Sequence, residues 1–292
     1  MEKKYELLHD DTRNNIFKKL YRIKALKDFN NVKAGDLGGY IEKEDNLSHE
    51  GDCWVYDNAE VFEEARIYEN AIVFNNAFVH GNAKIYGNAQ VSGDSQIYDN
   101  AKIYGNAEVH GINEIYDYAE IYGNAEVFGY ADVYDNAKVY GNSIICDNSE
   151  VFGNAKIYGS AEIYGNAKIY GKAKIYGSAE IYGETQVFDF ARIFGDTKIC
   201  SSSIINEKAN ISSNNDYALI HGFGPQNETT TFFRLKSGEI NAVNDYYSYP
   251  LPILKIKLQS KIKSNSPDDD IDLIKEFLLI ADVMESRFNR LK

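Results

Sequence analysis

The hydrophobic and polar positions of this chain repeat with a period of six over residues 55–211. Each unit has an aliphatic residue first, an aromatic second, Gly or Asp third, Asn fourth, a small residue fifth and a charged residue sixth. About 27 such units follow one another without an insertion. A short, unbroken period predicts a solenoid, in which each turn packs on its neighbours.

Strand geometry indicates which side chains of a unit point inward. Because side chains alternate along a strand, the small and the aliphatic residues are expected inside and the charged and aromatic residues outside. The Gly-Asn pair is expected to form the corner, since both residue types tolerate a positive φ.

The outward sixth positions indicate how many units close one turn. Sorted by unit number modulo three, one class is almost wholly basic: Arg66, Lys84, Lys102, Glu120, Lys138, Lys156, Lys174 and Arg192. A three-walled coil of 18 residues predicts this sorting, and tandem duplication of an 18-residue unit would leave the same trace. We predict an all-β solenoid, a single-stranded parallel β-helix of about nine coils. Its register resembles that of left-handed β-helices, which implies the left-handed sense.

The segments outside the repeat predict two caps. Residues 1–46 hold strand patterns at 5–8 and 20–23 and are expected to form an N-terminal β cap that covers the open edge of a repeat domain at 47–215.

Residues 216–292 predict a small α+β cap domain. Strand patterns at 217–220, 230–233 and 239–243 precede a helix expected to start at Ser266 and Pro267, with acidic residues near its positive dipole end. An apolar stripe at helical spacing follows and consists of Ile271, Ile274, Leu278, Ala281 and Phe288.

Composition limits the partners and the cellular compartment expected for this chain. A net charge of −13 argues against non-specific coating of DNA, and no apolar run approaches the roughly 20 residues of a membrane span. Cys146 and Cys200 are expected three coils apart, roughly 14 Å, which exceeds the roughly 7 Å Cα separation of a disulfide. A reducing cytoplasm of a bacterial host is therefore predicted, with no membrane partner.

Several segments carry a family resemblance: LYRI at 20–23, VKAGDLGGYIE at 32–42, NLS at 46–48 and CWVYDNA at 53–59. In these segments the chain resembles hexapeptide-repeat β-helix proteins labelled YdcK-like transferases, which are common in prophages. The likeness implies the β-helix fold and a phage or prophage origin. Relatives often end with a Cys-Phe-x-Gly-Thr stretch, whereas this chain has VNDYY at 243–247.

The basic class and its neighbouring aromatic residues form the predicted binding surface: Arg66, Lys84, Lys102, Lys138, Lys156, Lys174 and Arg192, with Tyr86, Tyr104, Tyr122, Tyr140, Tyr158 and Tyr176. Stacked like charges repel, so an anionic partner would favour keeping them. A host protein or ribonucleoprotein fits, with its RNA phosphates on the lysines and its bases on the tyrosines. Alternatively, the lysine stems cover the rings and the charged heads stay solvated.

Another face is expected to carry acidic residues: Glu60, Asp99, Glu114, Asp117, Asp132, Asp135 and Glu150. Regularly spaced carboxylates could imitate a nucleic-acid backbone, or they serve only to keep the surface soluble.

Candidate catalytic residues are few. Family likeness to β-helix acyltransferases implies a histidine base near an extruded loop at a trimer interface, but His80 and His110 occupy the aromatic position of an unbroken repeat. His221, just beyond the repeat, is the candidate base if the chain is an enzyme. The histidines and cysteines lack the spacing of a metal site, and no cofactor is predicted.

Two functional classes stay open. The first is a non-enzymatic, phage-encoded protein that binds a macromolecule, with inhibition of a host defence nuclease such as a CRISPR effector as its specific form. The alternative is a hexapeptide-repeat acyltransferase that uses acyl-CoA. A phage structural element is a third class, although two capped ends argue against end-to-end growth. A homodimer or trimer fits either of the first two classes.

Overall fold

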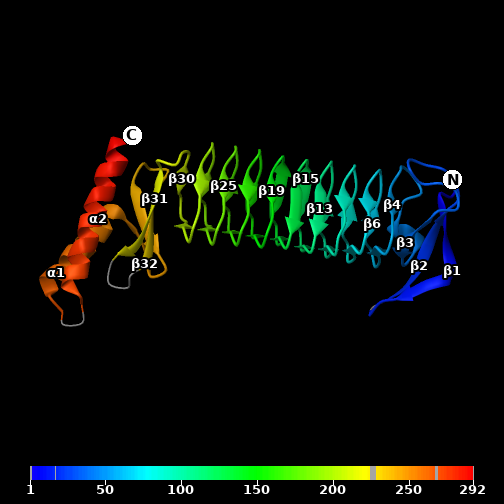
Figure 1. Cartoon of the computed structure of the whole chain (residues 1–292), viewed down its shortest axis with the longest axis horizontal. Coiled ribbons are helices and arrows are strands. Elements are labelled where there is room, and N and C mark those ends of the chain that lie inside the picture. Colours follow the sequence, from blue (N-terminus) through cyan, green and yellow to red (C-terminus); the bar gives the residue numbers. More distant parts are fainter. Residues whose placement is uncertain (1, 17, 224–227, 267–268, 292) are drawn as a thin grey trace. The chain divides into compact units, whose positions relative to one another are not determined.

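The computed structural model describes residues 2–16, 18–223, 228–266 and 269–291 (Figure 1). The chain divides into two compact units, Met1–Tyr164 and Gly165–Lys292. Both contain turns of a β-solenoid with about 18 residues per coil, and together they hold about ten turns. The coil length is as predicted, the number of turns is slightly higher than nine, and the left-handed sense stays a prediction.

An antiparallel region opens the first unit. Here β1 (Tyr5–Asn14) pairs antiparallel with β2 (Lys19–Ala25), which pairs antiparallel with β3 (Leu37–Ile41). The strands predicted at 5–8 and 20–23 are confirmed but are longer. Next, β3 pairs parallel with β5 (Glu60–Val61), so parallel stacking begins before the six-residue pattern does. A 3₁₀ turn, η1 (Glu44–Asn46), follows β3.

Two glycines of β3, Gly38 and Gly39, allow this strand to pair with β5. A Cβ at Gly38 would lie 2.5 Å from the carbonyl oxygen of Val55, and one at Gly39 would lie 2.6 Å from that of Ala59. No side chain fits at those separations, so the Gly-Gly pair lets β3 approach the first coil closely.

The repeat strands of the first unit form three parallel sheets, which we call sheets A, B and C. Sheet A continues from β3 through β5, β8 (Phe78–Val79), β11 (Gln96–Ile97), β14 (Glu114–Ile115), β17 (Asp132–Val133) and β20 (Glu150–Val151). Sheet B contains β4 (Trp54–Val55), β7 (Ile72–Val73), β10 (Gln90–Val91), β13 (Glu108–Gly111), β16 (Glu126–Gly129), β19 (Ile144–Ile145) and β22 (Glu162–Ile163). Sheet C contains β6 (Arg66–Ile67), β9 (Lys84–Ile85), β12 (Lys102–Ile103), β15 (Glu120–Gly123), β18 (Lys138–Gly141) and β21 (Lys156–Ile157).

The interior is built as the alternation predicts. Ala83 and Ile85, the fifth and first positions of neighbouring units, are both 0% exposed. Where the fifth residue is polar, it bonds to the backbone, because a buried hydroxyl or amide needs a partner. Ser95 Oγ donates to the carbonyl of Ser92 at 2.7 Å, and Asn113 Nδ2 donates to that of His110 at 2.8 Å.

The third residue of each unit makes the corner with a positive φ, as at Gly87 (73°) and Gly105 (75°). Acidic residues also take this strained conformation, and their side chains explain why. The Glu63 carboxylate accepts the backbone N–H of Gly81 in the next turn at 2.8 Å, and the Asp135 carboxylate accepts that of Gly153 at 2.9 Å. These hydrogen bonds offset the conformational strain.

The fourth-position asparagines do not have the predicted positive φ. Instead, their side-chain amides form a chain of hydrogen bonds along the solenoid, each Nδ2 donating to the Oδ1 of the asparagine one turn on at 2.9–3.0 Å. The chain runs through Asn70, Asn88, Asn106, Asn124 and Asn142. Asparagine is therefore selected here for its amide and not for its backbone.

The second unit holds further repeat strands and the C-terminal segment. The repeat strands are β23 (Lys168–Ile169), β26 (Gln186–Val187) and β29 (Ile204–Ile205) on one sheet, β24 (Lys174–Ile175), β27 (Arg192–Ile193) and β30 (Asn210–Ile211) on another, and β25 (Glu180–Ile181) with β28 (Lys198–Ile199) on the third. An antiparallel sheet follows, made of β31 (Tyr217–Phe223), β32 (Glu228–Arg234), β33 (Ile240–Asn244) and β34 (Tyr247–Pro250).

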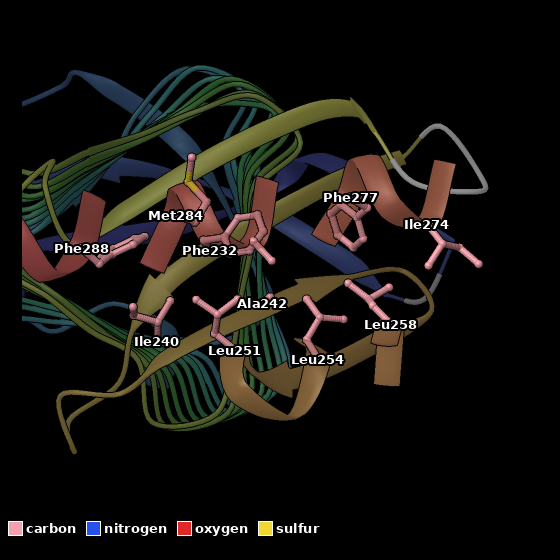
Figure 2. Close-up of a cluster of buried hydrophobic side chains, with 11 residues drawn as sticks. Phe232, Ile240, Ala242, Leu251, Leu254, Leu258, Ile274, Phe277, Met284 and Phe288 are labelled. Atoms are coloured by element: carbon pink, nitrogen blue, oxygen red, sulfur yellow. The ribbon is translucent and has the colours of Figure 1, made fainter. Parts of the chain in front are cut away.

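Two helices, α1 (Leu251–Ser264) and α2 (Ile271–Arg290), complete the α+β segment. Apolar side chains of both helices and of β32 and β33 converge on one core, where Phe232, Leu254 and Phe288 are labelled in Figure 2. Strand β34 and helix α1 were not predicted from the sequence.

The start of α2 differs from the prediction. The proposed first-turn Pro267 lies outside the described residues, and the N-cap is Asp270, whose carboxylate accepts the N–H of Leu273 at 3.2 Å. The predicted stripe is confirmed at Ile274, Ala281 and Phe288, which are buried. The helix therefore packs on the expected face although it begins later.

Candidate functional site

Sheet C carries the predicted basic row in register. Neighbouring partners are Arg66 with Lys84, Lys84 with Lys102, and Lys138 with Lys156. Each pair is separated by 18 residues, so the predicted coil length places these cations on one wall. Their role in binding stays a prediction.

Six tyrosines stand beside this row, and we call them the tyrosine ladder: Tyr68, Tyr86, Tyr104, Tyr122, Tyr140 and Tyr158. Consecutive rings stack with centroids 4.8–5.0 Å apart and interplanar angles of 3–5°. Each inner ring has a neighbour on both faces, so only ring edges and hydroxyls meet solvent. A nucleobase cannot stack on these rings unless the ladder opens.

One residue changes the electrostatics of the row. Glu120 lies between two lysines, with its carboxylate 3.4 Å from Lys102 Nζ and 2.8 Å from Lys138 Nζ. Burial alone would raise the pKa of Glu120, but the hydrogen bonds and charges of the two lysines outweigh burial and lower the pKa. The row therefore repels itself less than an unbroken stack of cations would, because Glu120 pairs with two of its lysines within the protein.

The second unit shows the same arrangement on a smaller scale. Lys174 pairs with Arg192 across β24 and β27, and the Tyr176 ring stacks on Phe194 with centroids 5.0 Å apart.

The acidic residues named in the sequence analysis differ in their surroundings. Glu60 is only 3% exposed and bonds to Arg13 at 3.1 Å, while Asp99 and Asp117 are corner residues with positive φ. On sheet A, Asp132 does lie beside Glu150. Burial, with the charges of its carboxylate neighbours, raises the pKa of Asp132. The imitation of a nucleic-acid backbone by these carboxylates stays a prediction.

Sheet B has an incomplete ring row, which we call the broken ladder: Phe74, Ser92, His110, Phe128, Cys146 and Tyr164. His110 stacks on Phe128 with centroids 5.1 Å apart. Ser92 replaces a ring, and beside it lies a groove of about 400 Å³ lined by Phe74, Gln90, Glu108 and His110 among others. Sequence reasoning missed this groove, although the non-aromatic residues at positions 92 and 146 were a visible signal.

His221, the predicted candidate base, is exposed on β31. Its Nδ1 lies 2.8 Å from Thr229 Oγ1, and among the described residues no carboxylate pairs with it. His80 lies within a ring stack, between Phe62 and Tyr98. Burial lowers the pKa of His80 despite the nearby charge of Glu63.

The described residues contain no group of three or more His, Cys, Asp or Glu side chains that could hold a metal ion. Within the same part of the chain, no helix combines the length and apolar character needed to cross a membrane. The three cysteines are free thiols, and burial, followed by the charges of Asp147 and Glu162, raises the pKa of Cys146 to about 11.

Comparison with known proteins points to one family. Residues 65–81 match the family described as "YdcK Beta solenoid repeat". The chain is 38% identical over 60 residues to a protein of Escherichia coli (strain K12) named "Uncharacterized acetyltransferase YdcK", and the matched stretch covers 20% of this chain and 18% of that protein. The chain is thus similar to YdcK β-solenoid proteins in these two stretches, and the comparison covers a small share of both sequences.

Proposed function

We propose that this chain is an acyl-group transferase that uses acyl-CoA as its donor. The observation that carries the proposal is the 38% identity over 60 residues to a solenoid protein named as an acetyltransferase. The solenoid architecture and the repeat match at 65–81 support the same assignment.

The transfer needs one base. An amine or hydroxyl acceptor attacks the thioester carbonyl, the new bond forms as the C–S bond breaks, a base takes the acceptor's proton, and the CoA thiolate leaves and is then protonated. His221 is the candidate base. Its Nδ1 lies 2.8 Å from Thr229 Oγ1, and this hydrogen bond orients the ring and leaves Nε2 as the nitrogen that would take the proton.

The direct test incubates the full chain with acetyl-CoA and a panel of amine and hydroxyl acceptors and measures release of free CoA thiol. We expect release that depends on an acceptor and that falls by about 100-fold or more in His221→Ala. His80→Phe is the control, because it replaces a half-buried histidine that lies outside the proposed site. Acceptor-independent release, or no release with any acceptor, would contradict the proposal.

A second function is favoured by the row of cations on sheet C: binding of a polyanionic partner. Lys84 and Lys156 are exposed. Burial is the main cause that raises the pKa of Tyr122, so its hydroxyl stays protonated and able to donate to phosphate or carboxylate oxygens. The surface thus offers charges and hydroxyl donors, not ring faces. A host ribonucleoprotein, or a defence nuclease inhibited by a phage-encoded chain, is the finer form of this proposal.

Charge reversal tests the second function. The triple change of Lys84, Lys102 and Lys156 to Glu should abolish capture of anionic partners, here heparin and single-stranded RNA, and should reduce the salt dependence of binding. The matched control reverses Lys236, Lys257 and Lys263, which are exposed cations elsewhere. Equal losses in both triple variants would show that net charge, and not this face, is responsible.

A further inference from the structure

The broken ladder on sheet B has an open position where the tyrosine ladder has none. Phe74, Ser92 and His110 occupy the same position in three successive turns. Ser92 is 7% exposed and forms the floor between the two rings, with the groove of about 400 Å³ above it. An aromatic ring is therefore missing at Ser92, between two rings of the row.

The width of the opening follows from the repeat. Adjacent rings in this protein stack at 4.8–5.2 Å, as for Tyr68 with Tyr86 and His80 with Tyr98. Two turns therefore separate the rings of Phe74 and His110 by about 10 Å. A flat ring placed midway would lie about 5 Å from each, within the roughly 4.5–7 Å that aromatic pairs prefer.

The polar side chains that line the groove indicate which kind of ring would bind there. Gln90 and Glu108 lie side by side on β10 and β13, two positions before Ser92 and His110, and both line the groove. A glutamine amide pairs with adenine through one donor and one acceptor, at the exocyclic amine and the adjacent ring nitrogen. The Glu108 carboxylate only accepts, so it favours an amine edge and disfavours phosphate.

We propose that the opening at Ser92 is a binding site for an adenine ring, stacked between Phe74 and His110 with its amine edge toward Gln90 and Glu108. The site goes beyond acyl transfer and stands without it, since binding needs no acyl donor. Adenine could come from a nucleoside or nucleotide, or from the CoA moiety of an acyl donor, and the chemistry of the ring is the same.

Adenosine is the first probe, titrated into the full chain and followed by saturation-transfer NMR. We expect saturable binding with a Kd on the order of a millimolar, with the ring protons receiving more magnetisation than the ribose. Inosine, which has a carbonyl in place of the amine, should bind about fivefold more weakly. No saturation up to about 10 mM adenosine, or equal binding of inosine, would overturn the site as proposed.

Ser92→Tyr is the decisive variant, because it fills the opening with the side chain most frequent at this position. It should weaken adenosine binding by at least about tenfold while the melting temperature stays the same or rises. Cys146→Tyr is the matched control: it fills the other non-aromatic position of the same ladder and should leave adenosine binding within about twofold. Binding that survives Ser92→Tyr would overturn the proposal.

Competition identifies the source of the ring. AMP and acetyl-CoA are each titrated against bound adenosine. Displacement by both, lost in Ser92→Tyr, supports the site with CoA as a source, while displacement by AMP alone supports it with a nucleotide as the source. Loss of thiol release in the transferase assay would leave these results unchanged, so the two proposals fail separately.

Discussion

The tyrosine ladder of sheet C and the broken ladder of sheet B occupy the same position of the repeat on two parallel sheets, but only the broken ladder contains non-aromatic residues. In sheet C, Tyr86, Tyr104 and Tyr122 stack at 4.8 Å and cover each other's faces. In sheet B, Ser92 interrupts the row and a groove appears. The comparison teaches that in this solenoid a complete ring row has no free faces, whereas a missing ring leaves two.

The presence or absence of a ring affects both the stability of the row and its ability to bind a ligand. A stacked pair contributes about 0.5–1.5 kcal/mol beyond the area that it buries, so each ring that is omitted weakens the row. A binding site in such a wall therefore costs stability, and a solenoid with many turns tolerates this loss because each turn contacts only its neighbours.

The largest expected effect tests whether the two sheets share one core. Ile103 lies beside Tyr104, Ile145 lies beside Cys146, and both isoleucines are 0% exposed. Replacing either with Ala should lower the free energy of unfolding by about 2–5 kcal/mol, because each change leaves a cavity under the same close packing. Urea denaturation measures both variants. A much smaller loss at Ile145 would mean that the core of sheet B is looser, and that the missing rings reflect poor packing.

The next largest effect is expected when one ring is removed from the tyrosine ladder of sheet C. Tyr104→Ser removes two stacked pairs, those with Tyr86 and Tyr122, and should cost about 1–3 kcal/mol. Urea denaturation against the wild-type chain gives the value. Tyr104→Phe is the control and should change little, since the ring is retained. A loss in Tyr104→Phe equal to that in Tyr104→Ser would show that the hydroxyl, not stacking, stabilises the row.

Much of this architecture is visible in the sequence because it is periodic. The in-out alternation, the 18-residue coil and the basic row all follow from regular positions such as Lys84 and Lys102. The features that could not be predicted from the sequence are the specific partners of individual side chains. Glu120 reads as an exception in a basic class, yet it binds the lysines on both sides. The fourth-position asparagines read as corner residues, yet their amides form a ladder.

The candidate site was harder to predict for a physical reason. A repeat pattern draws attention to what recurs, and the opening at Ser92 is defined by what does not. The C-terminal segment lacks a period altogether, so β34 and α1 depended on tertiary packing that local pattern does not reveal. Asp270 became the cap of α2 because its carboxylate reaches the N–H of Leu273.

A smaller effect is expected from making sheet C uniformly basic. Glu120→Lys places a cation between Lys102 and Lys138 and should lower the free energy of unfolding by about 1 kcal/mol at low salt, with partial recovery at high salt. Glu120→Gln separates loss of attraction from added repulsion and should cost less. Thermal unfolding at two salt concentrations measures both. Salt-independent losses would indicate that packing, not charge, is affected.

The smallest expected effect is a pH dependence from His80, whose ring directly follows strand β8 of sheet A. Burial between Phe62 and Tyr98 lowers the pKa of this imidazole, and the charges of Glu63 and Asp99 only partly oppose burial. The unfolded chain, where the pKa is about 6.5, then binds the proton more readily than the folded chain. Stability should therefore fall as the pH drops below about 6.5 and through the lower folded value. Denaturation midpoints of wild type and His80→Phe between about pH 7.5 and 5 test this. The Phe variant keeps the ring stack without a titrating group, so its midpoint should change less over that range, and parallel pH profiles would assign the dependence to other groups.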